Sequence, residues 1–153
     1  MQNRPRPRAL LPLAALALIA PAVTLDARPA GTDLTIEVTG LRNEHGRVLA
    51  CLTTNADNFP RCQNGNASYR QAVPAAEASR IRFHNVAPGT YAIALLHDEN
   101  GNGKADRALM IPKEGFGFSR DAPVRMGPPS FKDAAIAVGD APSRQTIHIR
   151  YML

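Results

Sequence analysis

Residues 88–96, with the sequence PGTYAIALL, indicate the fold more strongly than any other stretch of this chain. The Pro-Gly pair predicts a turn, because proline fixes φ and glycine permits positive φ. After the turn, Tyr91, Ile93 and Leu95 alternate with a second apolar set that ends at Leu96. Successive side chains of a strand point to opposite faces, so both faces of this strand are apolar. We therefore expect a central strand that is covered on both sides.

Other segments show the two-residue period or the apolar enrichment of strands, and they are residues 34–41, 47–52, 79–83, 134–138 and 146–152. An Asn-Glu-His-Gly turn separates the first two, which are predicted to form a hairpin. Residues 53–78 and 111–130 are rich in turn residues and are predicted to be long loops. With no helical period after the N-terminal region, the pattern predicts an all-β, immunoglobulin-like sandwich of about seven strands.

The N-terminus has the three parts of a secretory signal peptide. Arg4, Arg6 and Arg8 precede the apolar run 10–20, and small residues follow around Ala22. The run is too short for a membrane span, which needs about 20 apolar residues. An N-terminal core helix is the alternative, and the cleavage site could also fall a few residues later. We expect a signal peptide over 1–22, a flexible leader over 23–32 and one sandwich domain over 33–153, in a periplasmic or secreted protein without a transmembrane segment after cleavage.

The charge balance gives no indication of a nucleic-acid partner. The whole chain carries a formal net charge of +5. Removal of residues 1–22 with their three arginines lowers this to +2. No basic cluster with interleaved aromatic residues is left in the mature chain.

Two cysteines, Cys51 and Cys62, lie in the predicted mature chain. In an oxidising compartment an even pair at this spacing favours a disulfide, with two buried free thiols as the alternative. A disulfide closing a loop of this order stabilises a fold by roughly 3 kcal/mol in the chain-entropy model. A zinc site is disfavoured, because the spacing lacks the short knuckle of such sites.

The loop at residues 98–106, DENGNGKAD, could bind calcium. Asp98, Asn100, Asn102 and Asp106 stand at positions 1, 3, 5 and 9 of an EF-hand-like pattern, with glycine at position 6. Position 12, which holds a glutamate in such loops, is Leu109, so any affinity for calcium would be weak. The alternative is a metal-free loop in which Asp and Asn side chains bond their own backbone.

A glycine-rich segment at residues 115–119 carries two aromatic residues, Phe116 and Phe118. If exposed on a loop, these rings would form a binding platform, with Glu114 beside them. The alternative is that both rings fold back onto the sandwich. Ser119 lacks the flanking glycines of a nucleophile elbow, and no histidine spacing typical of a metal or catalytic site occurs.

Three blocks of the sequence carry a family resemblance, and they are FHNVAPGTYAI at 83–93, HDENGNGKAD at 97–106 and IPKEGFGFS at 111–119. In order and spacing the chain from about residue 33 resembles the bacterial exported family known as domain of unknown function 2141. Met110 and Arg120 depart from the family pattern, which has Gly and Asn there, and Arg120 puts in doubt an oxygen ligand at that place. The Pro-Gly-x-Tyr opening is also similar to transthyretin-like (prealbumin-like) and carboxypeptidase-regulatory-like sandwiches, an analogy of fold that assigns no activity.

These observations predict a non-enzymatic, exported β-sandwich accessory or binding module whose partner is a cell-envelope ligand or protein. Calcium at the 98–106 loop would stabilise it. One alternative is a glycan- or peptide-binding module that uses Phe116 and Phe118. The other is a cell-envelope enzyme that uses the acids Asp98, Asp106 and Glu114. Acids converging in a deep pocket would favour the enzyme.

Overall fold

The computed structural model describes residues 31–62, 68–103, 105, 107–108 and 111–153. The predicted signal peptide and most of the predicted leader lie outside these residues. Within the described parts of the chain, no helix is long and apolar enough to cross a membrane.

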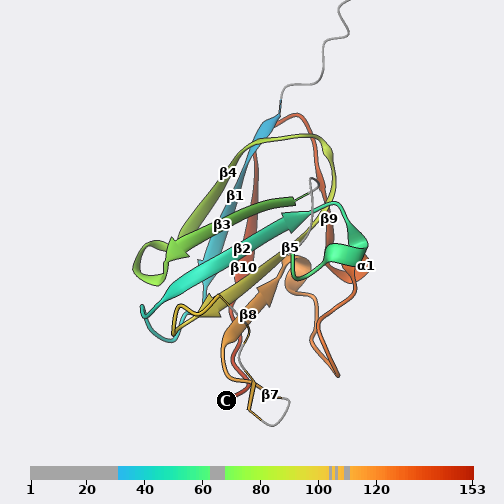
Figure 1. Cartoon of the computed structure of the whole chain (residues 1–153). Helices are drawn as coiled ribbons and strands as arrows, with labels where there is room; N and C mark the ends of the chain where they lie inside the picture. Colours follow the sequence, from blue (N-terminus) through green and yellow to red (C-terminus); the bar gives the residue numbers. More distant parts are fainter. Residues whose placement is uncertain (1–30, 63–67, 104, 106, 109–110) are drawn as a thin grey trace, which may run out of the picture.

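Two β-sheets pack face to face (Figure 1). Sheet A has the order β10-β1-β4, formed by β1 (Thr32–Thr39), β4 (Arg80–Val86) and β10 (Ser143–His148). Strand β1 is parallel to β10 and antiparallel to β4. Sheet B has the order β3-β2-β5-β8, with β9 also paired to β5, and its strands are β2 (Arg47–Thr53), β3 (Ser68–Pro74), β5 (Gly89–Asp98), β8 (Gly115–Phe118) and β9 (Ala135–Val138). The all-β sandwich prediction is therefore confirmed.

The remaining elements are short. They are the strand pair β6 (Arg107–Ala108) and β7 (Ile111–Pro112), the helix α1 (Phe131–Ala134), and the 3-10 turns η1 (Ala56–Asn58), η2 (Ala75–Glu77) and η3 (Ser119–Asp121). Helix α1 begins with a capping box, in which Ser130 and Asp133 each bond the other's backbone N–H.

Strand β5 is the central strand that the sequence predicts. One of its edges pairs with β2, and its other edge pairs first with β9 and then with β8. The change of neighbour falls at Ile93, between the pair Ala92–Ala135 and the pair Ala94–Phe118. Ser119 fills the gap, because its Oγ accepts from the Ile93 N–H at 2.9 Å and donates to the Ala134 carbonyl at 2.5 Å.

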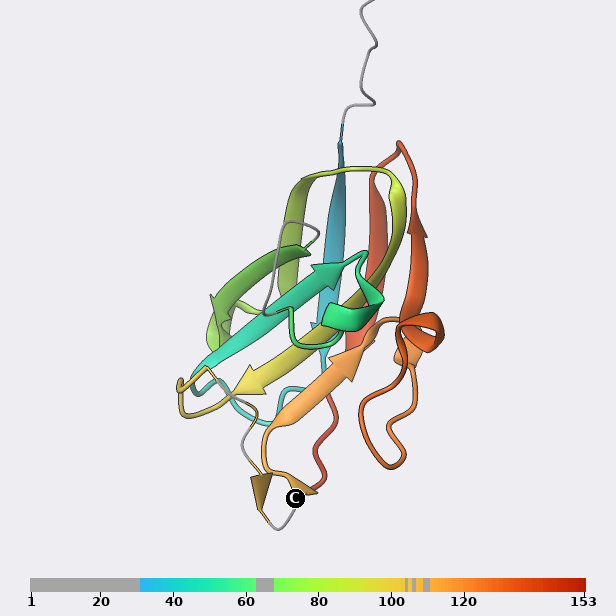
Figure 2. The same ribbon diagram turned by 45° about the vertical axis from the view of Figure 1, so that its right-hand side comes forward.

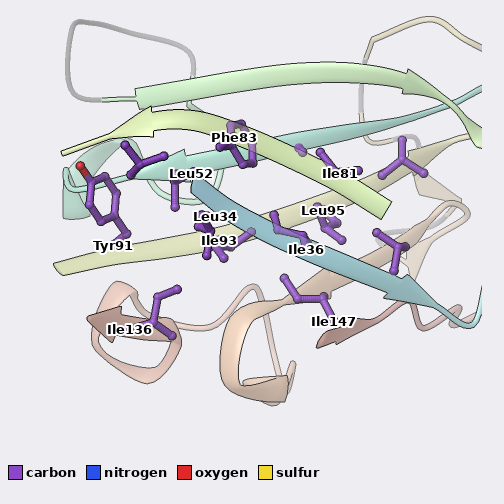
Figure 3. Close-up of a cluster of buried hydrophobic side chains, with 14 of the residues drawn as sticks. Leu34, Ile36, Leu52, Ile81, Phe83, Tyr91, Ile93, Leu95, Ile136 and Ile147 are labelled. Atoms are coloured by element: carbon purple, nitrogen blue, oxygen red, sulfur yellow. The ribbon is translucent and has the colours of Figure 1, made fainter. Parts of the chain in front are cut away.

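The main core lies between the two sheets (Figure 3). Strand β1 contributes Leu34, Ile36 and Val38, and β5 contributes Tyr91, Ile93 and Leu95 from the facing sheet. Tyr91 donates its hydroxyl to the Ala87 carbonyl at 2.9 Å, the structural role expected for a tyrosine at a strand start. Burial, together with the neighbouring Tyr69, raises the pKa of Tyr91 to about 12.

A second apolar cluster covers the opposite face of sheet B. It consists of Cys51, Cys62, Ala92, Ala94, Phe118, Ala122 and Ala134, with Phe59, Phe116, Val124 and Phe131 packed against it. The predicted disulfide between Cys51 and Cys62 is confirmed, with a Cα–Cα distance of 5.9 Å. It ties the segment that contains η1 onto β2, and this explains why Ala92 and Ala94 are buried on the face away from sheet A.

Three predictions about elements are wrong. The segments 34–41 and 47–52 form no hairpin, because both edges of β1 pair with β10 and β4 while β2 belongs to sheet B. The predicted loop 53–78 contains β3, and the predicted loop 111–130 contains β7 and β8. Within the described residues sheets A and B together hold eight strands, against the seven or so expected.

One corner of the sandwich is closed by a link between the two sheets. Phe116 of β8 and Arg150, two residues after β10, form an antiparallel bridge with N–H···O distances of 3.0 and 2.8 Å. Figure 2 shows the chain after β10 passing beside β8 on its way to the C-terminus. This link gives the edge strand β8 a backbone partner on its second side.

Candidate functional site

Phe116 and Phe118 lie on a strand rather than on the predicted loop. They project from the face of β8 that points away from the main core, with ring centroids 6.0 Å apart. Gly115 and Gly117 occupy the inward face, where Tyr151, Ile149 and Ile147 fill the space that a Cβ would take. Alternating glycine and phenylalanine thus let β8 lie close to the end of β10 and the residues after it, while its aromatic rings point outward.

The two rings have different surroundings. Phe118 is buried and makes an edge contact with Phe59 at a centroid distance of 5.9 Å, and Phe59 in turn contacts Phe131 at 6.2 Å. Phe116 is half-buried and stays accessible. The alternative in which the rings fold back therefore describes Phe118, while part of the Phe116 ring is accessible.

A groove of about 350 Å³ opens along β8. Its lining residues come from two stretches that are distant in the sequence. The first supplies Phe116–Phe118 and Asp121–Val124, and the second supplies His148 and Arg150–Met152. A second hollow, of about 560 Å³, lies inside the loop that precedes α1 and is lined by Pro123, Arg125–Ser130 and Asp133. The first hollow is the one that combines aromatic rings with charged side chains.

An ion pair stands at the groove. Arg150 contacts the Asp121 carboxylate twice, with Nε to Oδ1 at 3.3 Å and Nη2 to Oδ2 at 2.5 Å. Asp121 and Arg120 both have positive φ, of 50° and 59°, a region that non-glycine residues seldom adopt. Asp121 therefore combines an unusual backbone conformation with the ion pair to Arg150.

A polar network lies beside the groove, around Tyr151. The Arg42 guanidinium stacks on the Tyr151 ring, 4.4 Å from its centroid, and forms two bonds to Glu99 at 3.0 and 2.5 Å. Asn43 donates to the same carboxylate. The Arg42 hydrogen bonds, followed by those of Asn43, lower the pKa of Glu99 to about 2, and the bond to Glu99 raises the pKa of Arg42.

The buried His97 joins this network to the core. Its Nε2 lies 2.9 Å from the His45 carbonyl oxygen, which can only accept, so Nε2 carries the proton. The Nδ1 atom of His97 then accepts a hydrogen bond from the Tyr151 hydroxyl at 2.6 Å. The Tyr151 oxygen in turn accepts from the backbone N–H of Arg42 at 3.2 Å. All these groups are satisfied, so His97 is a structural residue that fixes the Tyr151 ring at the edge of the groove.

The Asp98 carboxylate is occupied by its own loop. Asp98 is fully buried, and it accepts from the N–H groups of Asn102 at 3.0 Å and Gly103 at 2.8 Å. Arg47 lies 3.8 Å from the same carboxylate, and Asn100 also accepts from the Asn102 N–H. These bonds are those of the metal-free alternative. Asp106 lies outside the described residues, so calcium binding at this loop stays a prediction.

Two of the three acids of the enzyme alternative, Asp98 and Glu114, lie apart from the groove, and the third, Asp106, is outside the described residues. Glu114 is buried and precedes Gly115, the partner of His97, so it lies next to Asp98 at the ends of β8 and β5. Neither Asp98 nor Glu114 lines either hollow. Among the described residues, no group of three or more His, Cys, Asp or Glu side chains is placed to hold a metal ion.

Four residues of the groove and its network escaped the sequence analysis: Arg42, Asp121, Arg150 and Tyr151. Arg42 and Tyr151 are 109 positions apart, and Asp121 and Arg150 are 29 apart, so no local motif connects them. The alternation of glycine and phenylalanine at 115–118 was the available signal for β8, since it has the period of a strand.

Comparison with known proteins gives one family match and one similar solved structure. The model of a bacterial family described as "uncharacterized protein conserved in bacteria", domain of unknown function 2141, matches residues 36–146. No curated protein matches the chain. A solved structure of a pilus-presented adhesin is similar, with 10% sequence identity and a TM-score of 0.36, over 82% of this chain and 28% of that chain.

Proposed function

This chain belongs to the bacterial family known as domain of unknown function 2141, and we propose that it is an exported, non-enzymatic β-sandwich module that binds an oligosaccharide of the cell envelope in the groove along β8. Export is supported by the predicted signal peptide and by the Cys51–Cys62 disulfide, since such bonds persist in oxidising compartments. The family match supplies no activity, so the binding proposal depends on the groove.

The observation that carries the proposal is the pairing of an accessible aromatic ring with fixed polar groups. Phe116 offers an apolar surface beside the half-buried Tyr151, and both line the groove with Arg150 and Asp121. A sugar ring has an apolar face and a rim of hydroxyl groups. An aromatic ring contacts the apolar face of the sugar. The guanidinium donates hydrogen bonds to the hydroxyl groups, and the carboxylate accepts hydrogen bonds from them.

The backbone of β8 favours a sugar over an extended peptide. A peptide that adds to a sheet needs an edge with free N–H and C=O groups. At this corner the second edge of β8 is used by the bridge between Phe116 and Arg150, and Ile147 fills the space next to Gly117. A peptide would have to bind through side chains alone.

Two features support binding rather than catalysis. Glycoside hydrolysis ordinarily uses two carboxylates that flank the scissile bond, and among the described residues Asp121 is the one carboxylate that lines the groove. The hydroxyl of Ser119 is occupied by Ile93 and Ala134 and is fully buried, so it is unsuited to act as a nucleophile.

Calorimetry with a panel of oligosaccharides from peptidoglycan and outer-membrane glycans, alongside peptides of similar size, tests the proposal. Phe116→Ala and Arg150→Gln should each weaken oligosaccharide binding by about tenfold or more, as is typical of central aromatic and arginine contacts. Phe131→Ala is the matched control, because it removes a ring of the same cluster that does not line the groove. Affinity that is unchanged in both groove variants, or binding of peptides alone, would contradict the proposal.

A further inference from the structure

The outer face of sheet A, which points away from the core, is polar throughout. The inward side chains of β1 and β4 are buried, and those of β10 are half-buried at Ser143 and Gln145 and buried at Ile147. The alternate side chains of the three strands are half-buried or exposed. The outward set in the middle of the sheet consists of Thr35, Glu37, Arg80, Arg82, Arg144 and Thr146. It holds three arginines and one glutamate, and Asp33 near the start of β1 contacts His84 on the same face. Three arginines therefore stand against two carboxylates, which leaves this face a local excess of one positive charge.

The strand register arranges these side chains in two rows. Thr35 of β1 pairs with Arg82 on one side and Arg144 on the other. Glu37 pairs in the same way with Arg80 and Thr146. Because paired residues lie on the same face, the arginines stand on both outer strands with β1 between them.

The single glutamate does not neutralise the arginines. Its Oε1 accepts from Arg144 at 2.6 Å and lies 3.9 Å from Arg80, so two guanidinium groups share one carboxylate oxygen. Arg82 is exposed and forms no ion pair with any described residue. Arg82 therefore faces solvent without an ion pair to a described residue, and Arg80 and Arg144 share the single negative charge of Glu37.

We propose that the outer face of sheet A binds the phosphate-bearing surface of an anionic lipid bilayer. Strands in a sheet are about 4.8 Å apart, so Arg82 and Arg144 stand roughly 10 Å apart across the sheet, and Arg80 and Arg82 roughly 7 Å apart along β4. The positive charge is therefore spread in two dimensions. A plane of lipid phosphates can meet all three guanidinium groups at once, whereas a single linear polyanion meets one row.

Arginine suits this role, because its planar fork donates two hydrogen bonds to one phosphate. The face has no exposed apolar side chain among its outward residues, so binding is electrostatic and does not insert into the bilayer. Each arginine near an anionic surface should then contribute roughly fivefold to binding, and salt should screen the effect within about 10 Å. None of these arginines lines the groove, so this surface is independent of the oligosaccharide proposal.

The inference is tested by purifying the protein from the compartment where it accumulates and measuring how much of it sediments together with lipid vesicles. The probes are vesicles of phosphatidylcholine alone and of phosphatidylcholine with phosphatidylglycerol, each at low and high salt. Binding should require phosphatidylglycerol and fall at high salt. The double variant Arg82→Gln, Arg144→Gln should bind roughly 25-fold more weakly, from a fivefold loss per arginine.

The matched controls change charge elsewhere. Arg125→Gln combined with Arg120→Gln removes two exposed arginines outside sheet A and should leave binding nearly unchanged. Arg82→Lys should retain most of the binding, and thermal melting checks that every variant is folded. Equal losses in the control pair would show a mere net-charge effect and overturn the proposal. Binding to inorganic polyphosphate chains but not to phosphatidylglycerol vesicles would overturn it in favour of a polymer ligand.

Discussion

The hydroxyl of Ser119 shows how much a single side chain contributes to this fold. It lies where β5 changes its neighbour from β9 to β8, and it serves the Ile93 N–H and the Ala134 carbonyl together. Both groups are buried, and a buried polar group without a partner costs free energy. No sequence pattern indicated this role, because Ser119 is 26 positions from Ile93.

Replacement of Ser119 by Ala should therefore lower the free energy of unfolding by about 2 kcal/mol, the cost of a buried group left unsatisfied. Urea unfolding at neutral pH measures the change. Ser130→Ala is the control, because it removes an exposed serine cap of helix α1 and should cost about 1 kcal/mol or less. Equal losses in the two variants would contradict the assigned role of Ser119.

Glu99 gives the account a pH-dependent prediction. The Arg42 bonds lower the pKa of Glu99 from an ordinary 4.5 to about 2. Its stabilising contribution is therefore fully present above pH 4.5 and is lost as the pH falls toward 2. Glu99→Gln should cost about 1–2 kcal/mol at pH 7, since Arg42 is partly exposed, and the difference from wild type should shrink below pH 4.5.

Denaturant unfolding of both proteins across this pH range measures the difference. Glu44→Gln, an exposed glutamate in the same connection between β1 and β2, is the control and should match wild type at each pH. A Glu99→Gln deficit that stays constant from pH 7 down to pH 3 would show that the ion pair does not set the pH dependence.

At the scale of elements, the strands with an apolar alternation were predictable and the others were not. β5 has apolar residues on both faces, and burial on both faces requires that pattern. β8 carries glycine on its inward face, where Ile147, Ile149 and Tyr151 supply the apolar atoms instead. Its burial therefore depends on side chains of β10 and of the residues after it. The glycine–phenylalanine alternation at 115–118 has the period of a strand, but it does not show which residues cover the glycine face.

The false hairpin has a similar cause. A turn cluster indicates that the chain changes direction, but the cluster does not specify which sheet the next strand enters. Here the connection carries the chain from sheet A to sheet B, and its Arg42 and Asn43 bind Glu99. The partners of β1 come from residues 80–86 and 143–148, which only the folded chain brings together.

The disulfide should matter for the cluster on the outer face of sheet B. Cys51→Ala combined with Cys62→Ala should lower the free energy of unfolding by roughly 3 kcal/mol, because the open chain gains conformational entropy when unfolded. Reduction of the wild-type protein should give a similar loss in thermal melting. An unchanged melting temperature after complete reduction would show that η1 packs on β2 without the bond.

The spacing of the loop that begins at Asp98 predicts a weak calcium site, and this can be tested directly. Millimolar calcium should raise the melting temperature of the wild-type protein but not that of Asp98→Ala. A midpoint that does not move with calcium in either protein would remove the site. Asp98 would then serve the loop backbone alone, through the bonds to Asn102 and Gly103.

At the scale of the whole molecule, sheet B has a core on each of its faces and sheet A has one on a single face. The sheet with two covered faces carries the groove, with the disulfide and a strained turn beside it. The other sheet presents arginines to solvent. Composition and periodicity were sufficient to predict the sandwich, but the groove needs Phe116, Asp121 and Arg150 to meet, which follows from the closed corner between the two sheets.

The most direct test of the central claim is an NMR titration of the isotope-labelled protein with the oligosaccharide that binds best. The largest amide shift changes should fall on residues 116–118, 121–124 and 148–152, the segments that line the groove. Shift changes concentrated on the loop at 123–133 without β8, or on the outer face of sheet A, would contradict the claim.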